Sequence, residues 1–268
     1  MNAVGVNTMS FMWRQPARAA LEALARVNYR VFEIMAQQPH FDPFMSSAEV
    51  ASFARFLRDA QLEVETLNIP SLDQNLASGT PQMRAHSVNV FKRLIDIAGE
   101  LGARGVIVVT GRVNPLIQPA RADLEAWFED SFASVLRHAE AARVALLLEN
   151  IPMGVYPDAK GLAALARRYD HPQVRVCYDI ANAHFIGEDA AGGVERVADY
   201  LAIAHFSDTR RDAWRHNPIG QGDCDFAGFC AALKRLAYRG TAMLEIVSPS
   251  PMEDIPASQA KLAALLPA

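Results

Sequence analysis

Short, nearly continuous hydrophobic runs alternate along this chain with longer stretches in which hydrophobic residues recur every three or four positions. A short run rich in Val, Ile and Leu is typical of a parallel strand buried on both faces. The longer pattern is typical of an amphipathic helix that covers such a sheet. The short runs predict strands at Ala3–Thr8, Arg30–Met35, Glu63–Ile69, Gly105–Thr110, Val144–Asn150, Arg175–Tyr178, Ala202–Phe206 and Ala242–Val247.

Helical patterns lie between these predicted strands and after the last one. They cover Pro16–Arg26, Ser47–Ala60, Pro81–Leu101, Arg121–Ala142, Ala159–Tyr169, Gly193–Tyr200, Phe226–Ala237 and Ser258–Leu266. Strands that alternate with helices predict a parallel sheet. Eight strand–helix units in 268 residues fit a closed barrel better than an open sheet. We therefore predict an α/β protein with one domain, residues 1–268, folded as a single (β/α)8 TIM barrel.

Composition and charge exclude several classes of protein. The chain is 51% hydrophobic and 21% charged, as is usual for globular proteins. Its net charge of -4 provides no basic field for nucleic acid or an anionic membrane. The three cysteines form no Cys-x-x-Cys pair, which suits a reducing compartment. We expect a cytoplasmic protein that binds neither nucleic acid nor membranes, and a homo-oligomer is compatible with the sequence.

Four residues at the ends of predicted strands carry the strongest chemical signal. They end the hydrophobic runs VALLLEN, VRVCYD, LAIAHF and TAMLEI, and they are Glu149, Asp179, His205 and Glu245. Barrels of this type carry their chemistry at the carboxyl ends of the strands, so these side chains are predicted to converge there. The strand ends supply no Arg or Lys to pair with the acids. One metal ion therefore explains the set better than separate ion pairs.

The motifs around these residues resemble the xylose isomerase-like TIM-barrel superfamily. They are LLLENIP, CYDIANAHF, AHFSD followed by PIGQGDCDF, and MLEI. The superfamily includes sugar isomerases and epimerases, inosose and dehydroshikimate dehydratases, and apurinic-site endonucleases. The resemblance implies that Glu149, Asp179, His205 and Glu245 bind one divalent cation. Mn2+, Mg2+ or Co2+ suit this oxygen-rich set best, and Zn2+ is a further candidate.

Further residues are candidates for contacts with the substrate. Arg211 lies six residues after His205, where ketose 3-epimerases carry a substrate-binding arginine, and its donors suit a hydroxyl, carboxylate or phosphate. A solvated loop arginine is the alternative. Asp208 is expected to cap its loop or to orient His205. The other candidates, for which packing or solvation is the alternative, are His184, Asn182, His216, Trp13 and Asn68.

Two departures from the related patterns restrict the function. Val155 and Asn182 stand where ketose 3-epimerases carry a glutamate and a histidine, which argues against a plain ketose 3-epimerase. Residues 68–71 and 110–112 contain none of the histidines that the endonucleases use for additional zinc ions. Together with the acidic net charge, this makes DNA repair a poor explanation.

The resemblance implies a divalent-metal-dependent isomerase or epimerase that acts on a sugar, a sugar phosphate or a keto acid. Glu149 and Glu245 would be the acid and base, and the reaction would pass through an enediolate. The main alternative is a dehydratase of the inosose or dehydroshikimate type, which expels a hydroxyl group after the same proton abstraction. A non-catalytic sugar-binding barrel is a third possibility.

Overall fold

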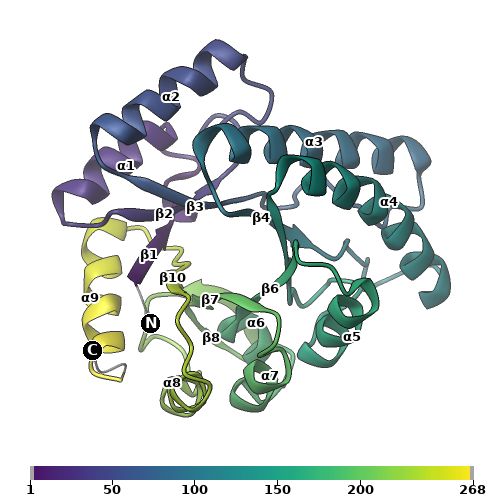
Figure 1. Ribbon diagram of the computed structural model, residues 1–268. Helices are drawn as coiled ribbons and strands as arrows, with labels where there is room; N and C mark the ends of the chain where they lie inside the picture. The colour runs from purple at the N-terminus through teal and green to yellow at the C-terminus, as the bar shows by residue number, and fades with distance from the viewer. Residues whose placement is uncertain (1–2, 266–268) are drawn as a thin grey trace.

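The computed structural model describes residues 3–265 and contains a closed barrel of eight parallel strands (Figure 1). The strands follow one another around the ring in chain order, and the first pairs with the last, Val6 opposite Leu244. This confirms the predicted (β/α)8 fold. The barrel strands are β1 Ala3–Asn7, β2 Val31–Met35, β3 Glu63–Asn68, β4 Gly105–Val109, β5 Ala145–Glu149, β6 Val174–Asp179, β7 Leu201–Phe206 and β10 Thr241–Leu244.

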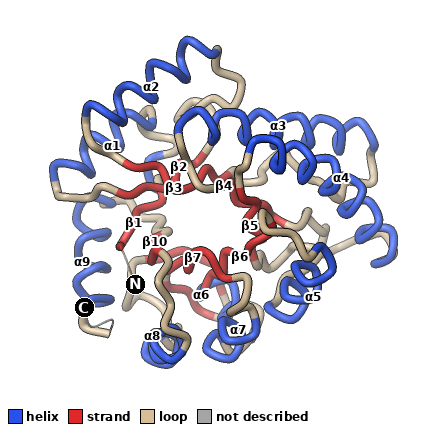
Figure 2. Tube along the Cα trace, viewed as in Figure 1, coloured by secondary structure: helices blue, strands red, loops and turns tan. Residues whose placement is uncertain are grey.

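Helices surround the ring of strands on the outside (Figure 2). The longest, α3 and α4, have 21 and 22 residues. Among the helices of residues 3–265, none has the length and apolar character needed to cross a membrane. The covering helices are α1 Ala17–Arg26, α2 Ser47–Asp59, α3 Pro81–Leu101, α4 Arg121–Ala142, α5 Ala159–Tyr169, α7 Ala190–Arg196, α8 Phe226–Arg235 and α9 Pro251–Ala263.

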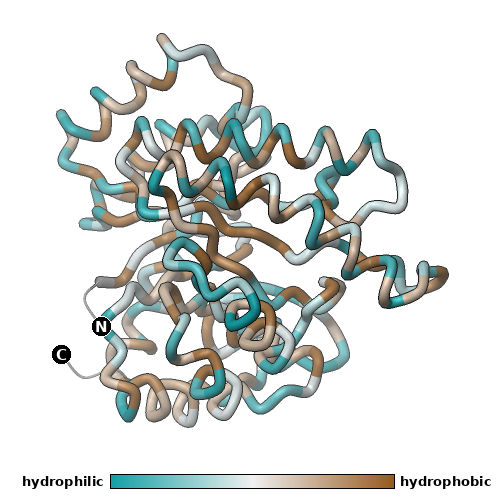
Figure 3. The backbone as a smooth tube through the Cα atoms, turned by 45° about the vertical axis from the view of Figure 1, so that its right-hand side comes forward, coloured by the Kyte–Doolittle hydropathy of each residue, from teal (hydrophilic) through white to brown (hydrophobic). Residues whose placement is uncertain are grey.

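Two hydrophobic layers follow from the alternation of side chains along each strand. Outward-facing residues such as Phe32, Leu146 and Phe206 belong to a large cluster between strands and helices. Inward-facing residues form a separate plug inside the barrel, made of Ile107, Leu147, Cys177, Ile203 and Met243. Figure 3 shows hydrophobic stretches through the middle of the molecule and hydrophilic ones on the outer helices.

This plug fixes the position of the chemistry-bearing residues. Two residues beyond a plug residue, the next inward-facing position on the strand is reached. On β5, β6 and β7 that position is Glu149, Asp179 and His205, and directly after β10 it is Glu245. A polar layer therefore lies on top of the apolar plug, at the carboxyl end of the barrel.

The structure differs from the predicted elements after β6 and after β7. A short helix, α6 (Ile180–Phe185), begins directly after Asp179, whose carboxylate accepts a hydrogen bond from the Asn182 backbone. The segment after β7, where the sequence pattern predicts neither strand nor helix, contains an antiparallel hairpin of β8 (Asp208–Arg210) and β9 (Ala213–Asn217). The hairpin lacks the hydrophobic run of a barrel strand, so the sequence pattern did not indicate it.

Two predicted helices, Gly193–Tyr200 and Ser258–Leu266, begin earlier than expected. Helix α7 starts at Ala190, where the Asp189 side chain caps it. Helix α9 starts at Pro251 and includes Pro256, which interrupts the helical pattern in the sequence. The end predicted for the last helix, Leu266, lies outside the described residues.

The turn after β9 requires a glycine at position 222. A Cβ atom there would overlap the backbone carbonyl oxygen of Thr209 and a carboxylate oxygen of Asp208. We expect Gly222→Ala to lower the free energy of unfolding by about 1–3 kcal/mol, because the backbone must shift to relieve the overlap. Urea unfolding of both proteins measures this loss.

A helix glycine with free space provides the control. A Cβ at Gly99 in α3 would lie 3.9 Å from its nearest neighbour, Val144. Gly99→Ala should stabilise the protein by roughly 0.5–1 kcal/mol, because alanine favours a helix interior. Wild-type stability in Gly222→Ala would contradict the requirement for glycine.

Candidate functional site

The four predicted metal ligands lie together at the carboxyl end of the barrel. Glu149 ends β5, Asp179 ends β6, His205 lies near the end of β7, and Glu245 follows β10. All four are at most 2% exposed. Each offers a ligand atom that lies within 4.8 Å of the others. One small cation at their centre would be within reach of all four side chains.

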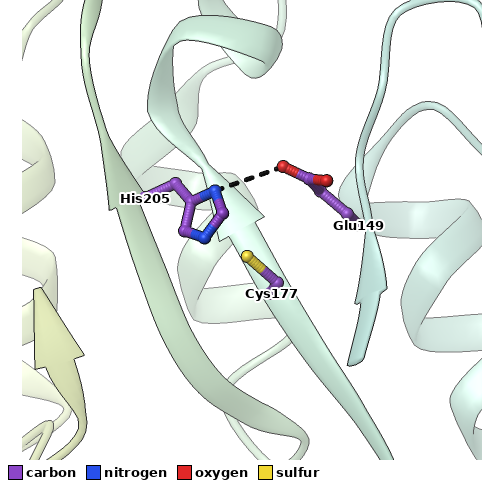
Figure 4. Close-up of side chains that lie close together, drawn as sticks. All are labelled: Glu149, Cys177 and His205. Carbon is purple, nitrogen blue, oxygen red and sulfur yellow. Dashed lines mark ion pairs between the residues drawn. The ribbon is translucent and has the colours of Figure 1, made fainter. Parts of the chain in front are cut away.

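The imidazole of His205 lies at the centre of this cluster. Its Nδ1 atom is 3.3 Å from Glu149 Oε1, 3.2 Å from Glu245 Oε2 and 3.9 Å from Asp179 Oδ2. Figure 4 shows the ring turned toward Glu149, with Cys177 beside it on the neighbouring strand. Nδ1 therefore faces the three predicted acidic ligands.

Cys177, together with Glu149 and His205, forms an alternative set of three residues. Their ligand atoms also lie within 4.8 Å of one another. Burial raises the pKa of the Cys177 thiol well above its ordinary value. A thiol that stays protonated is a poor ligand, because metals bind the thiolate. The oxygen-rich set with Asp179 and Glu245 is therefore the better metal site.

The charge balance of the cluster fits a bound cation. Asp179 Oδ2 is buried without a hydrogen-bond partner within residues 3–265, whereas Oδ1 accepts a 2.6 Å bond from the Asn182 backbone. Burial raises the pKa values of Asp179 and Glu245, and the neighbouring carboxylates raise both further. Buried carboxylates are costly unless a positive group compensates them. A divalent cation would compensate these and would give Asp179 Oδ2 a partner.

A fifth buried acid, Glu33 on β2, lies on the other side of the imidazole. Its Oε1 is 3.3 Å from His205 Nε2. It accepts hydrogen bonds from Asn7 Nδ2 (2.6 Å), Thr66 Oγ1 (2.6 Å) and Asn68 Nδ2 (2.9 Å). A histidine that binds a metal through one ring nitrogen commonly directs its other N–H toward a carboxylate. Glu33 is in the position of that carboxylate.

Glu33 was not among the residues predicted from the sequence, although its signal was present. An acid within the hydrophobic run VFEIM has the same character as Glu149 in LLLEN. Glu33 lies in the middle of its strand, so it did not stand out as a strand-end residue.

Burial has the largest single influence on the pKa of His205 and would lower it, despite the anions around the ring. Glu33 and Glu245 outweigh burial, and the pKa of His205 is raised well above its ordinary value.

A cavity of about 460 Å³ opens above the cluster. Two of the four predicted ligands, Glu149 and Glu245, line it. Three predicted substrate-binding residues also line it: Asn68, Asn182 and His216. Four further polar or aromatic residues on its wall were not predicted: Arg112, Trp214, Arg215 and Asn217.

Trp214 and His216, two of the residues that line the cavity, lie close to polar groups of the site. The indole N–H of Trp214 donates a 2.7 Å hydrogen bond to Asn182 Oδ1. His216 Nδ1 lies 3.2 Å from Glu245 Oε2 and 3.0 Å from the Ser207 hydroxyl. Burial lowers the pKa of His216. The hairpin strand β9 thus supplies one wall of the cavity.

Arg211, His184 and Trp13 lie outside this cavity. Arg211 and His184 line a separate hollow of about 240 Å³, where His184 Nε2 is 2.7 Å from Asp223 Oδ1. Trp13 is 61% exposed. Arg211 lies in the turn between β8 and β9, and the returning strand brings Trp214 and His216 to the cavity instead. The positions of these three residues therefore do not support substrate contacts.

Asp208 has the position expected of a loop-capping residue. Its carboxylate accepts hydrogen bonds from the backbone N–H groups of Thr209 (3.0 Å), Gly220 (2.7 Å) and Cys224 (3.2 Å). These bonds join the start of the hairpin to the turn that follows it. Asp208 therefore fixes the loop that carries β9 over the site.

Known proteins resemble this chain in sequence. It is 23% identical over 249 residues to an uncharacterized protein of Methanocaldococcus jannaschii, covering 90% of this chain and 82% of that protein. It is 24% identical over 186 residues to L-ribulose-5-phosphate 3-epimerase UlaE of Escherichia coli O1:K1. That match covers 69% of this chain and 64% of UlaE, so it spans slightly less than two thirds of UlaE.

Solved structures and a family match complete the comparison. A D-tagatose 3-epimerase-like protein superposes with a TM-score of 0.84 at 20% identity, over 98% of both chains. D-psicose 3-epimerase from Clostridium cellulolyticum H10, solved with D-tagatose, gives 0.83 at 17% identity, over 98% of this chain and 99% of that one. Identities this low speak for the fold alone. Residues 21–265 match the family described as xylose isomerase-like TIM barrel, and the chain belongs to that family.

Proposed function

We propose that this protein is a divalent-metal-dependent epimerase or isomerase of ketose sugars or their phosphates. One observation carries the proposal: of the four clustered residues, the two glutamates line the cavity. Glu149 and Glu245 come from strands that are separated in the ring by β6 and β7. Two carboxylates that reach one substrate cavity from different strands suit the removal of a proton on one face and its return on another.

The names of the relatives support an epimerase over an aldose–ketose isomerase. UlaE is an L-ribulose-5-phosphate 3-epimerase, and two structural neighbours are named for epimerisation of tagatose or psicose at carbon 3. Carbon 3 of a 2-ketose lies next to the carbonyl group, so its proton is acidic enough for a carboxylate base to remove. We extend this reaction class to the present chain.

The residues of the chain would divide the reaction between them. One glutamate takes the proton from the carbon next to the carbonyl, and the other gives a proton to the opposite face, which inverts that carbon. Asp179 and His205, which do not line the cavity, would hold the cation with them. The bound cation would polarise the carbonyl and stabilise the negative charge that develops on its oxygen.

The cavity wall would orient the sugar. The indole N–H of Trp214 donates a hydrogen bond to the side-chain oxygen of Asn182. The amide N–H groups of Asn182 therefore remain free to donate to a substrate hydroxyl. His216 lies against Glu245 and would keep that carboxylate in position. Asn182 and His216 both line the cavity, so the same wall would contact the substrate and Glu245.

Replacing either glutamate with glutamine tests the proposed acid and base. Glutamine keeps an oxygen ligand but cannot remove a proton. With Mn2+ occupancy restored, Glu149→Gln and Glu245→Gln should each slow turnover by roughly 10²–10⁴-fold. The assay follows conversion of L-ribulose 5-phosphate, D-tagatose and D-psicose to their epimers by NMR, with metal content measured in the same samples.

The control is Glu65→Gln, another buried acid of the barrel, which accepts a hydrogen bond from Thr241 at 2.5 Å. It should keep wild-type turnover. Near-normal turnover in both metal-loaded glutamine variants of the site would refute the acid–base assignment. A wild-type product lighter by one water molecule would instead identify a dehydratase.

Glu33 is expected to position His205 for metal binding. A glutamine at position 33 removes the negative charge beside Nε2, so Glu33→Gln should weaken Mn2+ binding by about 10–100-fold. Titration calorimetry should give one Mn2+ per chain for the wild type, a large loss of affinity for Asp179→Asn, and wild-type affinity for Glu65→Gln. Unchanged affinity in Glu33→Gln would remove this role, and two ions per chain would contradict a single-metal site.

A further inference from the structure

Two arginines, whose guanidinium groups have no role in the proposed reaction, line the cavity. Arg112 lies in the loop after β4, and Arg215 lies on β9. The arginine ion pairs within residues 3–265 all involve other arginines, so neither group has a carboxylate within 4.0 Å there. Two cations without a protein anion therefore line the cavity above a cluster of buried acids.

Arg112 is fixed in place by its surroundings. Its backbone N–H donates a 2.9 Å hydrogen bond to Asn75 Oδ1, and its carbonyl oxygen accepts a 3.0 Å bond from Asn75 Nδ2. One guanidinium nitrogen, Nη1, donates to the Ser71 carbonyl oxygen at 3.0 Å. A guanidinium carries five N–H donors, so most of them remain for a ligand. Fixed donors lose less freedom on binding than those of a mobile surface side chain.

Arg215 reaches the cavity from a different element. Its backbone N–H donates a 2.8 Å hydrogen bond to Thr209 Oγ1, which holds β9 against β8. Its neighbours on both sides, Trp214 and His216, also line the cavity. Arg215 is exposed, and Arg112 also lines an adjoining hollow at the surface. Both arginines therefore lie at the outer part of the cavity, away from its buried floor.

We propose that Arg112 and Arg215 bind a terminal oxyanion of the sugar substrate, a phosphate or a carboxylate, while its carbonyl end lies at Glu149 and Glu245. This inference rests on the proposed function and adds the substrate class to it. Guanidinium groups recognise phosphate and carboxylate through paired, charge-assisted hydrogen bonds. Much of the remaining wall is apolar, with Met9, Met12 and Leu72 among its residues, and offers no competing anion.

The test measures binding of probes that cannot be epimerised because they have no ketone. Ribitol, ribitol 5-phosphate and ribonate are titrated into the Mn2+-loaded protein by calorimetry. Ribitol 5-phosphate or ribonate should bind about 10- to 100-fold more tightly than ribitol, the range expected for hydrogen bonds to a charged group. The tighter of the two anionic probes identifies phosphate or carboxylate as the preferred group.

Variants connect the preference to the two arginines. Arg112→Gln and Arg215→Gln should each reduce the preference for the anionic probe by about 10-fold, and the double variant should abolish it. Arg210→Gln, an exposed arginine of the same hairpin that does not line the cavity, is the matched control and should leave the preference unchanged.

Equal binding of all three probes by the wild type would overturn the proposal, as would a preference that survives in the double variant. Failure of the proposed function has a different signature. An anion preference that depends on the arginines, without epimerisation of any ketose, would refute the reaction and leave the oxyanion site standing. Epimerisation without an anion preference would refute the oxyanion site alone.

Discussion

The buried negative charge around His205 is the constraint on which the rest of the site depends. Glu33, Glu149, Asp179 and Glu245 all lie within 4.0 Å of its ring nitrogens, and each is at most 2% exposed. Within residues 3–265 no lysine or arginine pairs with any of them. Such a group of anions is costly to bury, and a cation bound among them relieves the cost. The packing itself thus supports the proposed metal site.

Strand geometry explains how the fold collects these charges. The period of two along each strand carries Glu149, Asp179 and His205 to the same side as the apolar plug below them. An irregularity in the β2–β3 pairing contributes as well, because the register shifts so that Thr66 rather than Glu65 lies opposite Glu33. Thr66 then donates to Glu33. Barrel packing, the proposed metal ligands and their supporting network therefore share one set of inward-facing positions.

The sequence pattern predicted the features that depend on strand periodicity, but it did not predict the features that depend on loop conformation. The barrel and the convergence of the four strand-end residues followed from hydrophobic runs that end in an acid or a histidine. The position of Arg211 did not follow from the sequence, because its place six residues after His205 does not reveal that the chain turns back at that point. The same turn brings Trp214 and Arg215 to the cavity. Backbone pairing and the capping by Asp208 hold this hairpin, and neither leaves a hydrophobic pattern in the sequence.

The central claim is that a carboxylate removes a proton from the carbon next to the substrate carbonyl. Solvent isotope exchange tests it most directly. The Mn2+-loaded wild-type protein is incubated in D2O with L-ribulose 5-phosphate, D-tagatose and D-psicose, and the sugars are analysed by NMR and mass spectrometry. We expect at least one sugar to gain a single deuterium at carbon 3 as its epimer forms. An epimer that forms without deuterium, or a metal-loaded protein that exchanges no proton on any of these sugars, would contradict it.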